Sequence, residues 1–134
     1  MTDQEILFRY RLKEAEETLE DVQTMLQSTI TPRSILNRAY YVMFYAVLAL
    51  FLNKNISIKT SKHIGIISVF DREFVHTGKI ETYYSKILHK LFDKRQKGDY
   101  KEFATVSAED AAEAVRLAAE FLKAIKEYIS ENDV

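Results

Sequence analysis

The sequence predicts an all-α fold, an antiparallel up-and-down bundle of four to five helices in one domain covering residues 1–134. Three observations support this class. The chain has only three glycines and one proline, too few for the many turns of a β-sandwich or barrel. Apolar residues recur at helical spacing along several stretches. With 134 residues, 47% hydrophobic and 29% charged, the chain is of ordinary globular composition and one domain in size.

The first two helices carry clear start signals. Thr2 followed by Glu5 forms a capping box, and apolar residues then repeat at helical spacing to about Ser28. Thr31 followed by Pro32 pairs a capping side chain with proline at the first helical position, and the second helix should run to about Asn53. This helix is apolar almost all round, so we expect it to be innermost.

Three more helices are predicted in the second half of the chain. They span roughly residues 60–76, ended by Thr77-Gly78; 80–97, stopped by Gly98; and 107–130, capped by Ser107 with Asp110. Residues 99–106 should form a loop. Because the connections are short, neighbouring helices should pack antiparallel.

The setting expected for this domain is the cytoplasm. The absence of cysteine excludes disulfides and zinc–thiolate sites and fits a reducing compartment. The segment from Met1 to Met25 is charged and amphipathic, unlike a secretory leader. The longest apolar run, Ala39–Leu52, is shorter than the roughly 20 residues needed to cross a bilayer. We therefore expect no membrane association.

Charge is segregated along the chain although the net charge is only −1. Residues 1–28 carry three basic and seven acidic groups, and residues 102–134 carry three and eight. Residues 29–101 carry thirteen basic and five acidic groups. This pattern is compatible with a positive surface for an anionic partner. It is equally compatible with acidic outer helices that pair with basic neighbours.

The start of the second helix holds a candidate anion site. Arg38, Tyr41 and Tyr45 share one face, with Tyr40 and Phe44 on the adjoining stripe. Arg38 near a helix N-terminus could hold a phosphate. The alternative is an arginine paired with a carboxylate of the first or last helix, with the tyrosine rings in the core and their hydroxyls hydrogen-bonded.

The third predicted helix adds Lys62 and His63. His63 could contact a ligand or transfer a proton, because its reference pKa lies near neutrality. A packed or capping histidine is the alternative, and His76 and His89 are expected to be structural or at the surface. Since no histidines or carboxylates have metal-ligand spacing, we predict no metal and no cofactor.

The fourth predicted helix carries a basic stripe. Lys86, Lys90 and Lys94 recur every four residues, followed by Arg95 and Lys97. Such a face can follow a phosphate backbone without reading sequence. A simply solvated face is the alternative. Glycine-rich phosphate loops and nucleophile elbows are absent from the sequence, so nucleotide-binding and hydrolase folds have no support.

Several short runs together resemble one branch of the HEPN family, helical domains found mainly in prokaryotes and often encoded beside a minimal nucleotidyltransferase. The resemblance covers roughly residues 5–130 and depends on the order of four runs. These are Asn37-Arg38-Ala39-Tyr40-Tyr41, Ser61-Lys62-His63, Phe74-Val75-His76-Thr77-Gly78, and Arg95 with Asp99-Tyr100.

The resemblance implies a helical bundle that forms a homodimer. In active members an arginine and a histidine from each subunit line a cleft that cuts RNA without metal, and many members are toxins restrained by the nucleotidyltransferase. The motif is an arginine followed, after four to six residues, by a histidine. In this sequence Arg95 matches the arginine, and Tyr100 stands at the position of the histidine.

This departure affects the chemistry. Metal-free RNA cleavage needs a base for the 2′-hydroxyl, an acid for the leaving oxygen and a cation on the phosphate. Arg95 can supply the cation. Tyr100, with a reference pKa near 10, is a poor base at neutral pH but can donate a hydrogen bond. Asp99 could act as a base while adding negative charge, and His63 could replace the missing histidine if the fold brings it to Arg95.

Three functional hypotheses follow. The first is a HEPN-type dimer, the toxin-like member of a toxin–antitoxin-type pair with a minimal nucleotidyltransferase, which binds RNA or a nucleotide-bearing partner. Its proposed binding residues are Arg38, Tyr41, Lys62, His63, Lys90, Lys94, Arg95 and Lys97. The second is an active endoribonuclease that uses Arg95 with Tyr100, Asp99 or His63. The third is a non-catalytic protein-interaction domain whose arginines form core ion pairs. If the first or the second hypothesis is right, Arg38 and Arg95 should lie together in an accessible groove.

Overall fold

The computed structural model describes residues 1–100 and 105–132, with side chains for residues 1–96 and 105–132. Within these ranges all regular secondary structure is helical, which confirms the predicted class. The elements, in chain order, are α1 (Asp3–Met25), α2 (Pro32–Asn53), α3 (His63–Phe70), the π-helical segment η1 (Asp71–Val75), α4 (Thr82–Tyr100) and α5 (Ala108–Asn132).

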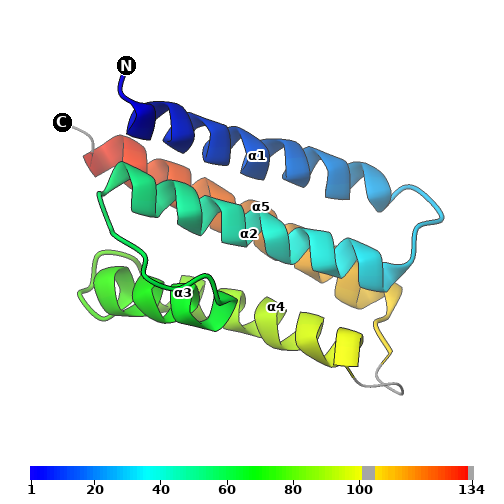
Figure 1. Cartoon of the computed structure of the whole chain (residues 1–134). Coiled ribbons are helices and arrows are strands. Elements are labelled where there is room, and N and C mark those ends of the chain that lie inside the picture. The colour runs from blue at the N-terminus through cyan, green and yellow to red at the C-terminus, as the bar shows by residue number, and fades with distance from the viewer. Residues whose placement is uncertain (101–104, 133–134) are drawn as a thin grey trace.

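The four long helices form an up-and-down bundle. Figure 1 shows α1, α2, α4 and α5 running alternately in opposite directions, with α1 and α4 at opposite edges and the two chain ends at the same end of the bundle. The short α3 lies beside α4. α2 contacts α1, α4 and α5, so it occupies the centre, as its all-round apolar sequence predicts.

The core is built around α2. Twelve of its residues are buried, and Tyr40 and Phe51 are among the largest fully buried side chains. By length and composition alone α2 could cross a membrane, but 67% of its most apolar stretch is buried inside the bundle. Such burial is what a central core helix requires.

Three predicted helix starts are confirmed by their capping hydrogen bonds. Thr2 Oγ1 accepts from the Glu5 backbone N–H, and Thr31 Oγ1 accepts from that of Ser34. Ser107 and Asp110 form a reciprocal capping box, with both backbone N–H to side-chain distances at 3.0 Å. Local capping chemistry therefore sets where these helices begin.

The third predicted helix begins later than expected. Thr60 Oγ1 accepts the backbone N–H of Lys62 at 3.1 Å, and Lys62 keeps an extended backbone, so α3 starts at His63. The helix then widens into η1, where the His76 N–H reaches the Asp71 carbonyl at 2.8 Å. Such π-type turns are rare and often accompany special side-chain placements.

Two predicted helix ends were wrong. α1 stops at Met25, three residues before Ser28, whose hydroxyl donates to the Met25 carbonyl at 2.7 Å. α4 continues through Gly98 to Tyr100, so glycine does not stop it. A glycine inside a helix costs only about 1 kcal/mol, which tertiary packing can offset.

Candidate functional site

Arg95 on α4 reaches across to α2. Its Nε donates to Asn37 Oδ1 at 2.7 Å, and its Nη2 donates to the Tyr41 hydroxyl at 3.4 Å. The guanidinium carbon lies 5.0 Å from the centre of the Tyr40 ring and 5.1 Å from that of Tyr41, within cation–π range. The side chain is half-buried, so the cation is held by the protein while part of it faces solvent.

His63, the first residue of α3, joins the same site. Its Nδ1 lies 2.9 Å from the Tyr40 hydroxyl and 3.5 Å from Arg95 Nη1. Its ring stacks on Phe44, with ring centres 3.9 Å apart and planes 14° apart. Burial lowers the pKa of His63, and the nearby Arg95 cation lowers it further, so the imidazole is neutral at pH 7. The sequence left open whether His63 reaches Arg95, and the fold brings them together.

The spacing of residues on α2 explains how one helix can support both groups. Asn37, Tyr40, Tyr41 and Phe44 recur at intervals of three and four, so they share one face. Tyr40 is fully buried, and burial strongly raises the pKa of its hydroxyl, which therefore stays protonated. The site thus has an aromatic floor and a polar rim that carries Asn37 and Arg95.

A family model supplies the decisive comparison for this helical site. The model described as the HEPN domain matches residues 8–128 of this chain. The chain belongs to the HEPN family. The match includes most of α1 and α5, all of the helices between them, and every residue of the Arg95 site.

Curated relatives of this HEPN chain agree with that assignment. A "UPF0332 protein" of Thermotoga maritima is 37% identical over 131 residues, covering 98% of this chain and 97% of the relative. A Methanocaldococcus jannaschii protein named "Putative toxin MJ0605" is 36% identical over 118 residues, covering 87% and 84%. A second one, "Putative toxin MJ0142", is 28% identical and covers 92% and 82%. The family and the fold expected from the short sequence runs are therefore confirmed.

Arg38 lies close to a carboxylate of α1. Its Nη2 lies 3.9 Å from Asp21 Oδ2 on α1, and the side chain is 42% exposed. Arg38 also acts electrostatically on Tyr45, whose pKa is raised mainly by burial and held back in part by this arginine. Asn37 and Tyr41 on the same helix support Arg95. The Asp21 contact matches the ion-pair alternative for Arg38. Anion binding by Arg38 together with Arg95 stays a prediction.

The predicted lysine surface is partly neutralised by α5. Lys90 forms an ion pair and hydrogen bond with Glu113, and Lys94 lies 3.5 Å from Asp110. The hydrogen bond from Lys90 lowers the pKa of Glu113. These contacts match the alternative in which acidic helices pair with basic neighbours. Phosphate binding by Lys90 and Lys94 stays a prediction, and Glu113 and Asp110 would weaken it because they partly neutralise the two lysines. Lys62 is exposed beside His63 at the N-cap of α3.

Three further sequence candidates lie at the end of α4. Lys97, Asp99 and Tyr100 belong to the helix, but their side chains lie outside the described residues. The proposed roles of Asp99 and Tyr100 as catalytic groups, and of Lys97 in binding, therefore stay predictions. Among the residues whose side chains are described, no three histidine or acidic side chains gather as a metal site would require.

Sequence reasoning missed a polar cluster between η1 and α4. Asp71 of η1 accepts from the Ser85 hydroxyl at 2.6 Å and lies 2.7 Å from His89 Nε2. Ser85 and His89 are four residues apart on α4, which was the only signal available. Because Asp71 stands between the other two, the cluster lacks the order of a nucleophilic triad, in which the histidine contacts the nucleophile. It ties η1 to α4, in keeping with the structural role expected for His89.

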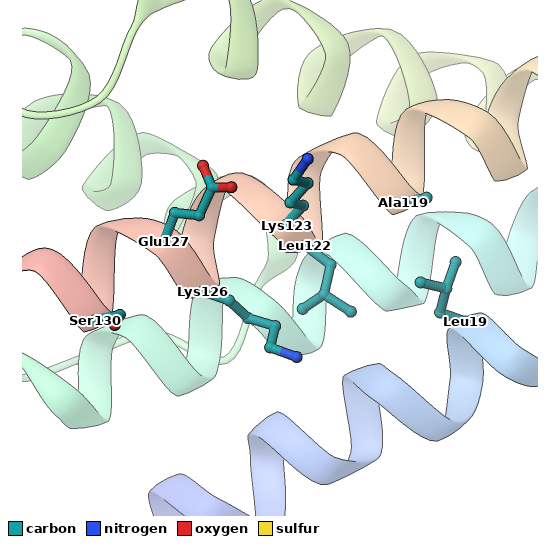
Figure 2. A pocket seen from close by; sticks show the side chains of 7 residues that line it. All are labelled: Leu19, Ala119, Leu122, Lys123, Lys126, Glu127 and Ser130. Atoms are coloured by element: carbon teal, nitrogen blue, oxygen red, sulfur yellow. The ribbon is translucent and has the colours of Figure 1, made fainter.

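A surface pocket between α1 and α5 shares no residue with the Arg95 site. It is lined by Leu19, Ala119, Leu122, Lys123, Lys126, Glu127 and Ser130. Figure 2 shows Leu19 and Leu122 on facing helices, with Lys126 extending towards α1. Lys126 Nζ lies 2.9 Å from Glu16 Oε2, so an ion pair joins the two helices beside this pocket.

Proposed function

We propose that this chain is the toxin-like member of a HEPN–nucleotidyltransferase pair, acting in the cytoplasm and binding RNA through Arg95 and His63. Membership of the HEPN family and relatives named as putative toxins support the toxin-like role. The wider resemblance supports a homodimer and a minimal nucleotidyltransferase as the partner. A nucleotide carried by that partner presents the same phosphate group as RNA, so it is the alternative ligand for this site.

The observation that carries this proposal is the setting of Arg95. Its guanidinium is half-buried, supported by Asn37 and Tyr41 on α2, and adjoins His63 on α3. A positioned cation in a partly dehydrated site binds phosphate more strongly than a solvated lysine does. Arg95 also has several N–H groups arranged in a plane, which suits two oxygens of one phosphate.

RNA binding is tested with single-stranded RNA and a matched pair of charge variants. Arg95→Gln removes the cation of the site. Arg116→Gln removes one positive charge from α5, where Arg116 is 62% exposed and pairs with Glu120. We expect Arg95→Gln to weaken binding by roughly tenfold or more and Arg116→Gln to change it little. Equal effects of the two variants would mean that RNA binding reflects the overall charge of the protein, and would contradict a binding site at Arg95.

The role in a pair is tested in cells. Expression of the chain alone should slow growth of a bacterial host, and co-expression of a minimal nucleotidyltransferase encoded beside its gene should restore growth. Arg95→Gln should be harmless by itself. Size-exclusion chromatography with light scattering should give twice the 15.6 kDa chain mass for the purified protein. Growth inhibition that persists in Arg95→Gln would contradict the proposal.

Active RNA cleavage is the second candidate, and the contact between His63 and Arg95 is the observation in its favour. Labelled RNA should be incubated with the wild type in the presence of a metal chelator. Cleavage that Arg95→Gln abolishes would support the ribonuclease. Binding without cleavage would leave the non-catalytic RNA-binding role.

A further inference from the structure

The buried hydroxyl of Tyr40 limits how His63 can hold its proton. The Tyr40 side chain is fully buried, and its hydroxyl has one hydrogen-bond partner in the described part of the chain, His63 Nδ1 at 2.9 Å. A buried O–H that donates to nothing costs about 1–3 kcal/mol. The hydroxyl therefore donates to Nδ1, which must carry a lone pair rather than a proton.

Arg95 imposes the same requirement on the same nitrogen. Its Nη1 lies 3.5 Å from His63 Nδ1, and a guanidinium can only donate. A proton on Nδ1 would face a positively charged N–H and would leave the Tyr40 hydroxyl without an acceptor. Two donors thus converge on Nδ1. The proton of the neutral imidazole consequently lies on Nε2.

The aromatic neighbours hold the orientation of the ring. Phe44 stacks against one face of His63, Tyr40 lies nearly parallel at 5.7 Å between centres, and Tyr41 meets the ring edge-on at 5.7 Å. Among the residues whose side chains are described, the charged and titratable groups around His63 are Arg95 on α4, Tyr40 and Tyr41 on α2, and its neighbour Lys62. Because burial and Arg95 both lower the pKa of His63, the neutral state persists at pH 7.

We propose that His63 is a fixed hydrogen-bond donor, offering its Nε2–H to a phosphate oxygen of bound RNA, and that Tyr40 is the positioning residue that sets this tautomer. The inference rests on the proposed RNA-binding function. His63 is then neither base nor acid. Its Nδ1 lone pair is occupied by Tyr40, and a neutral N–H is too weak an acid to protonate a leaving oxygen. A neutral imidazole can still stabilise negative charge as a donor.

The tautomer is measured in the free protein, without RNA, by nitrogen-15 NMR of the histidine rings at pH 7. Wild-type His63 should carry its proton on Nε2. Tyr40→Phe keeps the buried ring and removes the donor, so the Nδ1–H form of His63 should become more populated. The ring signals of His76 and His89 should not change and serve as the internal control. A proton on Nδ1 of the wild type, or a tautomer ratio that Tyr40→Phe leaves unchanged, would overturn the inference.

RNA binding provides the second arm. The side-chain amide of His63→Gln can place an N–H near the position of Nε2–H, whereas His63→Ala cannot. We expect affinity to fall roughly tenfold in His63→Ala and no more than about threefold in His63→Gln. Equal losses in the two variants would contradict the donor role. If the wild type cleaves RNA, His63→Gln should retain most of the cleavage rate. A cleavage rate as low as that of His63→Ala, with RNA binding intact, would show that His63 transfers a proton and would overturn the inference.

The two proposals fail separately. Absence of RNA binding by the wild type rejects the proposed function and, with it, the phosphate contact of His63. The NMR measurement still decides whether Tyr40 sets the tautomer. Thermal unfolding of each variant shows whether the bundle is intact before either result is interpreted.

Discussion

Arg95 Nε lies 2.7 Å from Asn37 Oδ1, although the two residues are 58 positions apart in the chain. This hydrogen bond joins α4 to the first turns of α2 and orients the guanidinium. The orientation of this cation therefore depends on a neutral side chain of the central helix. Asn37 was visible in the sequence only as part of a run that resembles the family.

Truncation of Asn37 changes the orientation of the Arg95 side chain and leaves its charge in place, so it tests the effect of orientation alone. Asn37→Ala should lower the free energy of unfolding by about 1.5–3 kcal/mol, because one hydrogen bond to a charged group is lost. RNA affinity should fall, but less than in Arg95→Gln. Asn37→Asp keeps an acceptor for Arg95 and adds a negative charge, so it should retain stability and weaken RNA binding. Urea unfolding and RNA titration check both variants, and RNA binding that improves in Asn37→Asp would contradict this account.

Phe44 tests the position of the central helix. It is 7% exposed and stacks on His63. Phe44→Ala should cost about 3–5 kcal/mol, since removal of a buried aromatic ring leaves a cavity. Phe44→Leu, which retains more of the volume, should cost less. A loss below roughly 1 kcal/mol in urea unfolding of Phe44→Ala would place the ring outside the core.

Gly65 tests the close contact between α3 and the segment before it. A methyl group at Gly65 would lie 2.5 Å from Thr60 Cγ2. Gly65→Ala should therefore destabilise the protein by about 1–3 kcal/mol. Thr60→Ser removes Cγ2 and keeps the hydroxyl that accepts from Lys62, so combining it with Gly65→Ala should recover much of the loss. Thermal unfolding of the single and double variants measures this coupling. Additive losses would mean that the two residues are not in contact.

The Asp71 cluster should matter for stability and not for RNA. Asp71→Ala removes the acceptor of both Ser85 and His89, and should lower the free energy of unfolding by about 1–3 kcal/mol. Ser85→Ala should cost less, because the contact between His89 and Asp71 remains. RNA affinity should stay within about twofold in both variants. A large loss of RNA binding by folded Asp71→Ala would give this cluster a functional role.

The lowered pKa of His63 predicts a contribution to the pH dependence of stability. Just below the ordinary histidine value of 6.5, the unfolded chain binds a proton at His63 that the folded chain does not. Stability therefore falls as the pH drops through this range and is retained above it. Unfolding free energies at pH 7.5 and 5.5 should differ more for the wild type than for His63→Gln. An equal difference in the two proteins would contradict the lowered pKa.

Local sequence signals predicted most of the helices and part of the site. The caps at Thr2, Thr31 and Ser107 fixed three helix starts because each needs only side chains within three residues. Gly98 misled the prediction, because one glycine costs a helix only about 1 kcal/mol and does not by itself end it. For Arg38 the sequence left open a bound anion or a carboxylate of the first or last helix, and the structure places Asp21 of α1 beside it. Helical periodicity assigns a residue to a face and does not identify the helix that covers that face.

The sequence by itself determined the helical class, the family and the central place of α2, because caps, spacing and apolar content are properties of neighbouring residues. Only the tertiary structure decided that Arg95 and His63 share the Tyr40–Tyr41 face while Arg38 turns to α1. Those contacts join residues 17 to 58 positions apart. These contacts depend on how α1, α3 and α4 pack against α2. Burial, ring stacking and the need of buried hydrogen-bond donors for acceptors select one arrangement.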